Sequence, residues 1–304
     1  SGYGVWSLVW MYLCQASLSS LQLWFRTGWR PDFLFDKERF SRHFNFGYKL
    51  MLSGLIDAVY NNAYNIIIGR IYPAAQLGYY TRAMSIRQLP VQNLATALNK
   101  VTFPVFSSIQ QDNERLKAAY KRIMQQVIFW TTPTLVILGI VAKPLFVLLF
   151  TDKWLPAVPY FRILCVIGLL YPIQAYNLNI LKIKGRSDLF LKLEIIKKVL
   201  ITVGIILALP FGIFGLLYVQ VILSFSAYGI NSYYSGKFID YPALRQLRDI
   251  IPVILKGILP GLLVYFLMYY VLQGNLWPDI LQILLVFVSY SLLYLGINQW
   301  MKPA

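Results

Sequence analysis

The stretch LGYYTRAMSIRQLPVQNLATALNKVTFPVF, residues 77–106, decides the fold. It is long enough to cross a bilayer as one helix, yet it carries three cations, Arg82, Arg87 and Lys100. Because each helical residue turns by about 100°, Arg82, Asn93 and Lys100 fall within a narrow arc of one face. An arginine at the bilayer centre raises the insertion free energy by about 2.5–3.5 kcal/mol. We therefore expect this face to line a hydrated, protein-walled cavity that holds an anion.

A second interpretation of the cations remains open. Arg82 and Lys100 lie near the two ends of the stretch, so their charged groups can reach the headgroup layers while their stems stay among the acyl chains. This explanation suits Arg87 less well, because that residue lies deeper. It also leaves the amides of the same stretch unexplained. These are Gln88, Gln92, Asn93 and Asn99. The amides favour a polar cavity wall.

The composition is typical of a membrane protein rather than of a soluble domain. Of the 304 residues, 58% are hydrophobic and 13% are charged, and the mean hydropathy is +0.57. The apolar residues form blocks of about 20, and lipid excludes open strand edges. We therefore predict an all-α membrane protein with about nine transmembrane helices. Their approximate ranges are 3–25, 46–69, 77–106, 122–142, 158–182, 188–209, 211–235, 250–272 and 278–300.

Basic residues alternate between successive loops. The loops after the first, third, fifth and seventh predicted helices are rich in Lys and Arg, whereas the loops between them carry few. Since basic residues mark the cytoplasmic side, the C-terminus with Lys302 is predicted to be cytoplasmic. The net charge of +16 then lies mostly in cytoplasmic loops, where it meets anionic membrane lipid, and Lys197 and Lys198 lie just inside the helix that follows one of them. It does not indicate a nucleic-acid partner.

The predicted helix 46–69 carries a second polar face. Its polar residues follow one another at i+4 spacing. They are Lys49, Ser53, Asp57, Asn61 and Asn65. We take Asp57 to be the only carboxylate well inside an apolar block, and hence a candidate H⁺ or Na⁺ coupling site or counter-ion. The alternative is a structural partner for Arg82 or Arg87 on the next helix, and both interpretations place Asp57 toward the bundle interior.

The sequence carries no motif for catalysis, for a metal or for a cofactor. A phosphate-binding loop, a nucleophile elbow and a His/Cys cluster are all missing from it. Cys14 and Cys165 show no pairing pattern, and the single His43 lies in a predicted loop. We therefore expect a protein that is not an enzyme and that moves an anionic solute. Because residue 1 is Ser, the chain is expected to be the later part of a longer polypeptide.

Four motifs in consistent order cover nearly the whole chain. The longest is LSGLIDAVYNNAYNIIIGRIYPAAQLGYYTRAMSIRQLP, residues 52–90. The others are GYGVWSLV (2–9), FPVFSSIQQD (103–112) and LFTDKWLPAVPYFRIL (149–164). With these motifs the sequence resembles Wzx-type lipopolysaccharide and exopolysaccharide flippases. That group belongs to the multidrug/oligosaccharidyl-lipid/polysaccharide (MOP) exporter superfamily, which includes the MATE-like transporters.

The resemblance implies a domain division. Such proteins have two six-helix lobes around a central cavity, often followed by two extra helices. Residues 1–30 would then be the last helix of the N-terminal lobe, and 31–45 a cytoplasmic interfacial linker. Residues 46–235 would form the C-terminal lobe, and 236–304 the extra helix pair with a cytoplasmic C-terminus. The five preceding helices of this plan are not in the sequence.

The resemblance also implies a function, the flipping of undecaprenyl-diphosphate-linked oligosaccharide repeat units across the bacterial inner membrane for polysaccharide biosynthesis, by alternating access. Arg82, Arg87 and Lys100 would bind the diphosphate. Amides would bind the sugars, namely Gln88, Gln92, Asn93, Asn61 and Asn65. Further expected partners are membrane lipid, H⁺ or Na⁺ coupled through Asp57, and polysaccharide polymerase or assembly proteins.

Two alternative functions stay open at this point. The first is a MATE-like multidrug/ion antiporter of the same superfamily, for which acidic cavity walls would suit cationic drugs. The second is a non-transporting scaffold subunit of a polysaccharide assembly complex, in which the chain only holds other components together. The charge of the cavity discriminates the first from a flippase, and transport activity discriminates the second.

Overall fold

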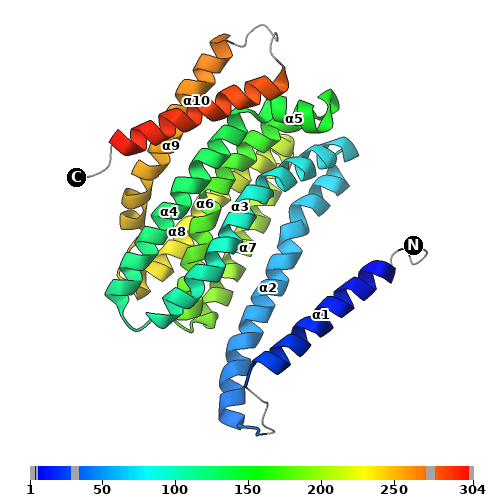
Figure 1. The fold of residues 1–304 in the computed structure, drawn as a ribbon. Coiled ribbons are helices and arrows are strands. Elements are labelled where there is room, and N and C mark those ends of the chain that lie inside the picture. Colours follow the sequence, from blue (N-terminus) through cyan, green and yellow to red (C-terminus); the bar gives the residue numbers. More distant parts are fainter. Residues whose placement is uncertain (1–3, 5, 29–33, 272–277, 301–304) are drawn as a thin grey trace. The chain divides into compact units, whose positions relative to one another are not determined.

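The structure is a computed structural model that describes residues 4, 6–28, 34–271 and 278–300. Within these ranges it is helical and contains no strand (Figure 1), which confirms the prediction of an all-α protein. The elements are α1 (Trp6–Arg26), α2 (Lys37–Ile71), α3 (Ala74–Ser108), α4 (Asn113–Ile140), α5 (Ala142–Phe150), the 3-10 turn η1 (Asp152–Trp154), α6 (Ala157–Ile183), α7 (Ser187–Ala208), the 3-10 turn η2 (Leu209–Phe211), α8 (Gly212–Phe238), α9 (Ala243–Val271) and α10 (Asp279–Trp300). Lys302, at the C-terminus that we predict to be cytoplasmic, lies outside the described residues.

Five helices in the described part of the chain are long and apolar enough to cross a membrane. They are Asn113–Ile140, Ala157–Ile183, Ser187–Phe238, Ala243–Met268 and Asp279–Gln299. The third contains two predicted spans, α7 and α8, joined by η2. The helices α1, α2 and α3 are not among the five, because polar residues interrupt their apolar ones. The chain is a multi-pass membrane protein, and the predicted number of nine spans stays a prediction.

The chain divides into two compact units, Ser1–Phe44 and Asn45–Ala304. The first unit contains α1 and the first turns of α2. Asp36 caps α2, since its carboxylate accepts the backbone N–H groups of Glu38 and Arg39 at 2.9 and 3.1 Å. The described part of the expected linker 31–45 is therefore helical from Lys37, and α2 continues without a break into the predicted span 46–69.

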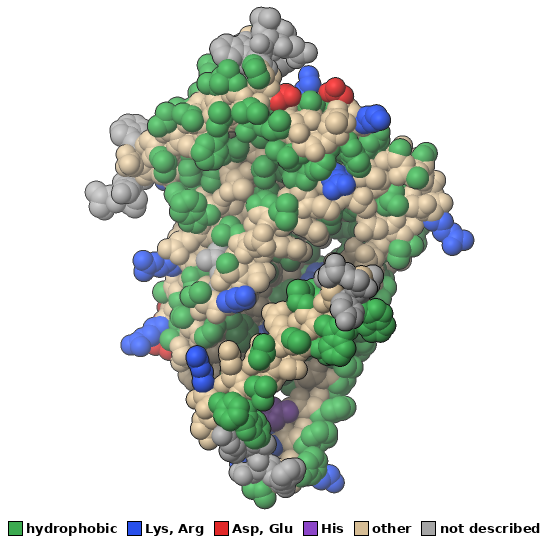
Figure 2. Space-filling model, turned by 45° about the vertical axis from the view of Figure 1, so that its right-hand side comes forward, with side chains coloured by type: hydrophobic (Ala, Val, Ile, Leu, Met, Phe, Trp, Pro, Cys, Tyr) green, Lys and Arg blue, Asp and Glu red, His purple; other side chains and the backbone are tan. Residues whose placement is uncertain are grey.

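In the second unit α6 is the central helix. It contacts α3, α4, α7 and α8, which run beside it (Figure 1). Phe161, Leu164 and Ile180 of α6 are fully buried, because apolar residues lie on nearly all of its sides. The outer helices expose apolar residues instead, such as Ile222 on α8 and Phe266 on α9. Hydrophobic side chains also cover much of the face seen in Figure 2, as expected for surface in contact with lipid.

The connections of the second unit gather at two opposite ends. At one end Lys184, after α6, donates to the Asn113 side chain of α4 at 2.7 Å, and Lys117 of α4 lies 3.7 Å from Asp240, after α8. We call this the basic end. At the other end Tyr72, before α3, donates to the backbone carbonyl of Leu209 at 3.2 Å. The basic connections therefore share one end, the grouping that the alternation of basic loops predicts.

Candidate functional site

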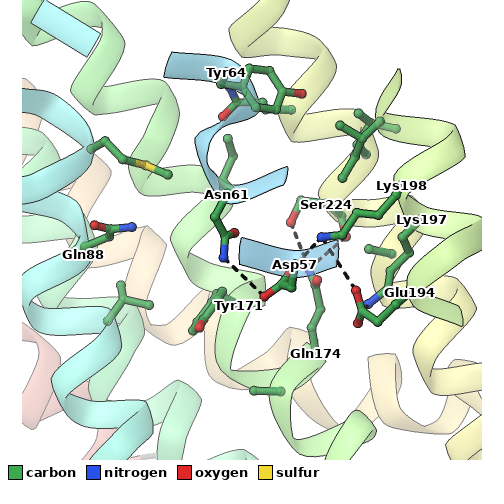
Figure 3. A pocket seen from close by; sticks show the side chains of 18 of the residues that line it. Asp57, Asn61, Tyr64, Gln88, Tyr171, Gln174, Glu194, Lys197, Lys198 and Ser224 are labelled. Carbon is green, nitrogen blue, oxygen red and sulfur yellow. Dashed lines mark hydrogen bonds and ion pairs between the residues drawn. The ribbon is translucent and has the colours of Figure 1, made fainter. Parts of the chain in front are cut away.

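A polar cavity of about 440 Å³ lies inside the second unit, between α2, α3, α6, α7 and α8 (Figure 3). Its charged lining residues are Asp57, Arg87, Glu194, Lys197 and Lys198. Its uncharged polar lining residues are Asn61, Tyr64, Gln88, Gln92, Tyr171, Gln174, Gln220 and Ser224. We call it the central cavity. Its polar lining lies among apolar helices, and charged side chains at such a position require polar surroundings.

Three of the charges come from one face of α7. Glu194, Lys197 and Lys198 share this face because they are spaced at i+3 and i+4. The Lys197 ammonium lies 2.6 Å from one Glu194 oxygen, and that of Lys198 lies 3.7 Å from the other. Lys198 also reaches α2, where it donates to Asp57 at 2.6 Å. Asn61 donates to the second Asp57 oxygen at 3.3 Å, so α2 and α7 are joined by a charged network (Figure 3).

This network is buried on α7 and open on α2. The side chains of Glu194 and Lys198 are 7% and 10% exposed, whereas that of Asp57 is 50% exposed. Two ammonium groups face two carboxylates, and this pairing offsets the desolvation of each charge. Asp57 is the member that solvent or an ion can reach most easily.

Arg87 is the cavity cation without a carboxylate. No Asp or Glu of the described residues lies within 4.0 Å of its guanidinium, and the residue is only 7% exposed. One Nη donates to the sulfur of Met84 at 3.0 Å, a weak acceptor, and Nε has no partner. A buried charge is unfavourable unless it is paired. Together with the balanced network, Arg87 gives the charged lining of the cavity a net charge of +1, and its Nε donor has no partner.

One face of α3 supplies this wall. The residues at its 3–4 spacing are Met84, Arg87, Gln88 and Val91, with Gln92 beside them. Gly168 of α6 permits the close approach of the two helices, because a Cβ there would meet the Arg87 Cδ at 3.3 Å and Leu135 Cδ1 at 2.9 Å. The Arg87 stem therefore packs against α6 at Gly168.

The face of α3 predicted from the narrow arc is a different one. Arg82 lies five residues before Arg87, which is about 140° away around the helix. The structure does not bring Arg82, Asn93 or Lys100 to the central cavity, and all three are exposed. Arg82 instead lies over the rings of Phe150 and Trp154, at 4.8 and 5.3 Å from their centroids. A cation–π contact thus engages the residue expected to bind an anion.

On α2 the predicted polar face is divided. Asp57 and Asn61 line the central cavity, but Asn65 does not; it is half-buried and its side-chain oxygen has no hydrogen-bond partner. The alternative that Asp57 pairs with Arg82 or Arg87 is wrong, since its ion-pair partner is Lys198 on α7. The sequence gives no local signal for this pairing, because Lys198 of α7 lies 141 residues after Asp57.

Sequence reasoning missed Glu194 and misjudged two lysines. Glu194 lies inside the predicted span 188–209 and contradicts the expectation that Asp57 is the only inner carboxylate. Lys197 and Lys198 were expected just inside the helix, next to the basic loop, and were not assigned to the site, but both are buried in the network with Glu194. The i+3 and i+4 spacing of one acid and two bases in an apolar helix is the signal that could have identified this cluster.

Comparisons with known proteins place the chain in a family. A family model described as "Polysaccharide biosynthesis protein" matches residues 1–159. The chain is 30% identical over 165 residues to the teichuronic acid biosynthesis protein TuaB of Bacillus subtilis (strain 168), covering 54% of this chain and 34% of TuaB. It is 28% identical over 224 residues to the lipopolysaccharide biosynthesis protein WzxC of Escherichia coli (strain K12), covering 71% of this chain and 46% of WzxC.

A third relative is named for transport. The chain is 25% identical over 176 residues to the succinoglycan biosynthesis transport protein ExoT of Rhizobium meliloti (strain 1021), covering 58% of this chain and 36% of ExoT. No solved structure matches. The chain thus spans a third to about half of the length of these relatives. The resemblance drawn from the motifs is confirmed, and the chain belongs to the polysaccharide biosynthesis protein family, with a Wzx-type protein among its relatives.

Proposed function

We propose that the chain is part of a transporter that flips undecaprenyl-diphosphate-linked oligosaccharides across the bacterial inner membrane. The observation that carries this proposal is Arg87, a buried cation without a carboxylate that lines a polar cavity in a membrane bundle. The names of the relatives support it, since WzxC is named for lipopolysaccharide biosynthesis and ExoT for succinoglycan transport. A transporter of this kind performs no covalent chemistry, so we propose no catalytic residue.

The chemistry of the central cavity suits the head of such a lipid. A guanidinium donates two parallel hydrogen bonds to a phosphate, and Arg87 has donors free for this purpose. Gln88, Gln92 and Asn61 can donate to and accept from sugar hydroxyls on the same wall. A volume of about 440 Å³ is on the scale of a small-ligand site, so we propose that it holds the diphosphate and the first sugar rather than a whole repeat unit.

Asp57 is our candidate for coupling to H⁺ or Na⁺. Its carboxylate is half exposed and paired with Lys198, so a proton or Na⁺ that replaces Lys198 would free that ammonium within the cavity. The release would raise the positive charge of the cavity and break a contact between α2 and α7. We propose that this step changes access to the cavity by moving α2, as alternating access requires. Asp57→Asn is expected to abolish the dependence of flipping on the ion gradient.

We place the basic end on the cytoplasmic side, with the C-terminus there as well. Lys117, Lys184 and Arg186 gather at this end, as the positive-inside rule requires of cytoplasmic loops. Cysteines introduced at Lys184 and at Thr151 test this orientation by their reaction with a membrane-impermeant reagent. In intact spheroplasts, only the cysteine at position 151 should react.

Polysaccharide polymerase or assembly proteins are the proposed partners in the membrane.

The cavity charge separates the flippase from the antiporter alternative. With a net charge of +1, the central cavity favours an anionic ligand over a cationic drug. The scaffold alternative predicts instead that substitution of Arg87 has no effect on export. The same variants of Arg87 therefore test both alternatives.

The test compares two arginines of the same helix. Arg87→Ala should lower polysaccharide export at least tenfold in cells that lack the chromosomal gene, because it removes the phosphate donors. Arg87→Lys should retain part of the export, since it keeps the charge but not the bidentate geometry. Arg82→Ala is the matched control, because the Arg82 side chain stacks over the rings of Phe150 and Trp154 and does not line the cavity. Equal export by all three variants at equal protein level in the membrane would refute the proposal.

A further inference from the structure

A second cavity, of about 470 Å³, lies at the basic end between the first turns of α4 and α9. Its charged lining residues are Glu114, Lys117, Lys121, Arg245, Arg248 and Asp249. Tyr241, from the connection between α8 and α9, completes the polar lining. We call it the basic-end cavity, and none of its residues belongs to the central cavity.

Both carboxylates of this lining are already engaged. Asp249 accepts from the Lys121 ammonium at 2.9 Å and from the Tyr241 hydroxyl at 2.6 Å. Glu114 lies 3.7 Å from Lys117. Burial and the hydrogen bond to Asp249 hold the pKa of Tyr241 above its ordinary value, so its hydroxyl stays uncharged. The lining therefore presents four cations and two carboxylates, a net charge of +2.

Arg245 and Arg248 are the cations left without an ion pair. Within the described residues no carboxylate lies within 4.0 Å of either guanidinium, although Asp249 is adjacent in sequence. Their i+3 spacing places them on one face of α9, within its first two turns. The positive end of the helix dipole disfavours cations there and favours an anion. The two exposed arginines therefore lie where an external anion would be favoured, with no carboxylate of the described chain in ion-pair distance.

The surroundings indicate that this counter-charge belongs to a lipid. The helices on both sides, Asn113–Ile140 and Ala243–Met268, are long and apolar enough to cross a membrane, so the cavity lies at the level of a headgroup layer. Leu244, Ile251 and Leu255 of α9 are exposed beside or below the two arginines. A phosphate at the arginines would place its acyl chains along these side chains.

We propose that the basic-end cavity binds the phosphate headgroup of an anionic phospholipid. Arg245 and Arg248 are the primary donors, and Lys117 adds long-range attraction. A lipid bound between α4 and α9 stabilises their association, because it binds the folded arrangement and not the unfolded chain. This inference does not depend on the flippase proposal, since it concerns other residues at another depth.

The experiment measures lipid affinity of the protein purified in neutral detergent. Fluorescent phosphatidylglycerol is titrated into the wild type and into Arg245→Gln/Arg248→Gln, with phosphatidylcholine as the uncharged reference. The double variant should bind phosphatidylglycerol about 30-fold more weakly, because each of the two charges contributes about fivefold. Arg245→Lys/Arg248→Lys, which keeps both charges, should lose less than the glutamine variant. Circular dichroism and gel filtration establish that the variants are folded.

A matched control removes the same charge elsewhere on the basic end. Arg115→Gln/Arg186→Gln deletes two exposed arginines that are paired with Asp112 and Asp188 and that line neither cavity. It should leave phosphatidylglycerol affinity within twofold of the wild type. An equal loss in this control would overturn the proposal, because general surface charge would then explain binding. Competition by millimolar inorganic phosphate as strong as that by the lipid would overturn the lipid assignment in favour of a soluble anion.

Discussion

Two helix contacts of the second unit differ in chemistry: the α2–α7 contact includes an ion pair, whereas the α4–α9 contact includes closely packed glycines. Between α2 and α7, Asp57 and Lys198 form an ion pair at the central cavity. Between α4 and α9, beyond the basic-end cavity at their first turns, the two helices are in close contact at Gly257 and Gly261. A Cβ at Gly261 would lie 2.2 Å from the Val136 side chain.

The difference teaches which contact can change and which cannot. An ion pair with one half-exposed member can exchange its partner for another ion, so we expect the α2–α7 contact to be the one that changes. Small residues that bring two helix backbones together act through dispersion, which falls quickly with separation. Tyr290 of α10 adds a buried hydrogen bond to the Gly257 carbonyl at 2.8 Å. We therefore expect α4, α9 and α10 to move as one body beside a mobile charged contact.

The largest effect is expected from Glu194, the most buried member of the charged network. Glu194→Leu leaves the Lys197 ammonium buried without its partner, and we expect a loss of about 3 kcal/mol in the free energy of unfolding. Denaturant titration in detergent measures it. Glu194→Leu/Lys197→Met should recover about half of the loss, since the orphaned charge is removed as well. A single variant as stable as the wild type would show that the network adds nothing to stability.

A smaller effect is expected at the close contact. Gly261→Ala should lower the free energy of unfolding by about 1–3 kcal/mol, because the new methyl group overlaps Val136. Gly139→Ala is the matched control on α4, where a Cβ meets nothing within 4 Å, and it should be neutral or stabilising. Gly261→Ala/Val136→Ala should restore most of the loss by making room. Similar stability of the two single glycine variants would contradict a tightly packed α4–α9 contact.

Arg87 should show an effect of opposite sign. Because its guanidinium is buried without a carboxylate, Arg87→Met is expected to raise the free energy of unfolding by about 1 kcal/mol in anion-free detergent. The same variant should lose diphosphate binding, measured with undecaprenyl diphosphate as the probe. A destabilisation of more than about 2 kcal/mol would indicate a structural role for Arg87 in place of the proposed binding role.

The smallest effect is expected at Arg82. Arg82→Gln removes a cation–π contact with Phe150 and Trp154 on an exposed side chain, so the loss should be about 0.5–1 kcal/mol. Thermal unfolding of Arg82→Gln and Arg82→Lys measures it, and the lysine variant should lie between. Loss of diphosphate binding in Arg82→Gln would favour the predicted arc of α3 over the face that lines the central cavity.

Much of the helix layout could be predicted from local signals. The expected span 158–182 compares with Ala157–Ile183, and 188–209 with Ser187–Ala208. Apolar blocks and turn residues are local properties of the chain, so their boundaries are visible in the sequence. The choice between the two polar faces of α3 was not predictable, because each face carries cations and amides. Only the position of α6, with Gly168 against the Arg87 stem, decides which face points inward.

The sequence by itself determined an all-α membrane protein of the polysaccharide biosynthesis family and a polar surface on α2 and α3. The tertiary structure decided that Arg87 is buried unpaired, that Asp57 binds Lys198 and that Glu194 belongs to the site. The physical reason is the distance along the chain over which each interaction acts. Hydrophobic blocks act over one helix, whereas the pairing of a buried charge depends on which helix, 141 residues further along in the case of Asp57, packs against it.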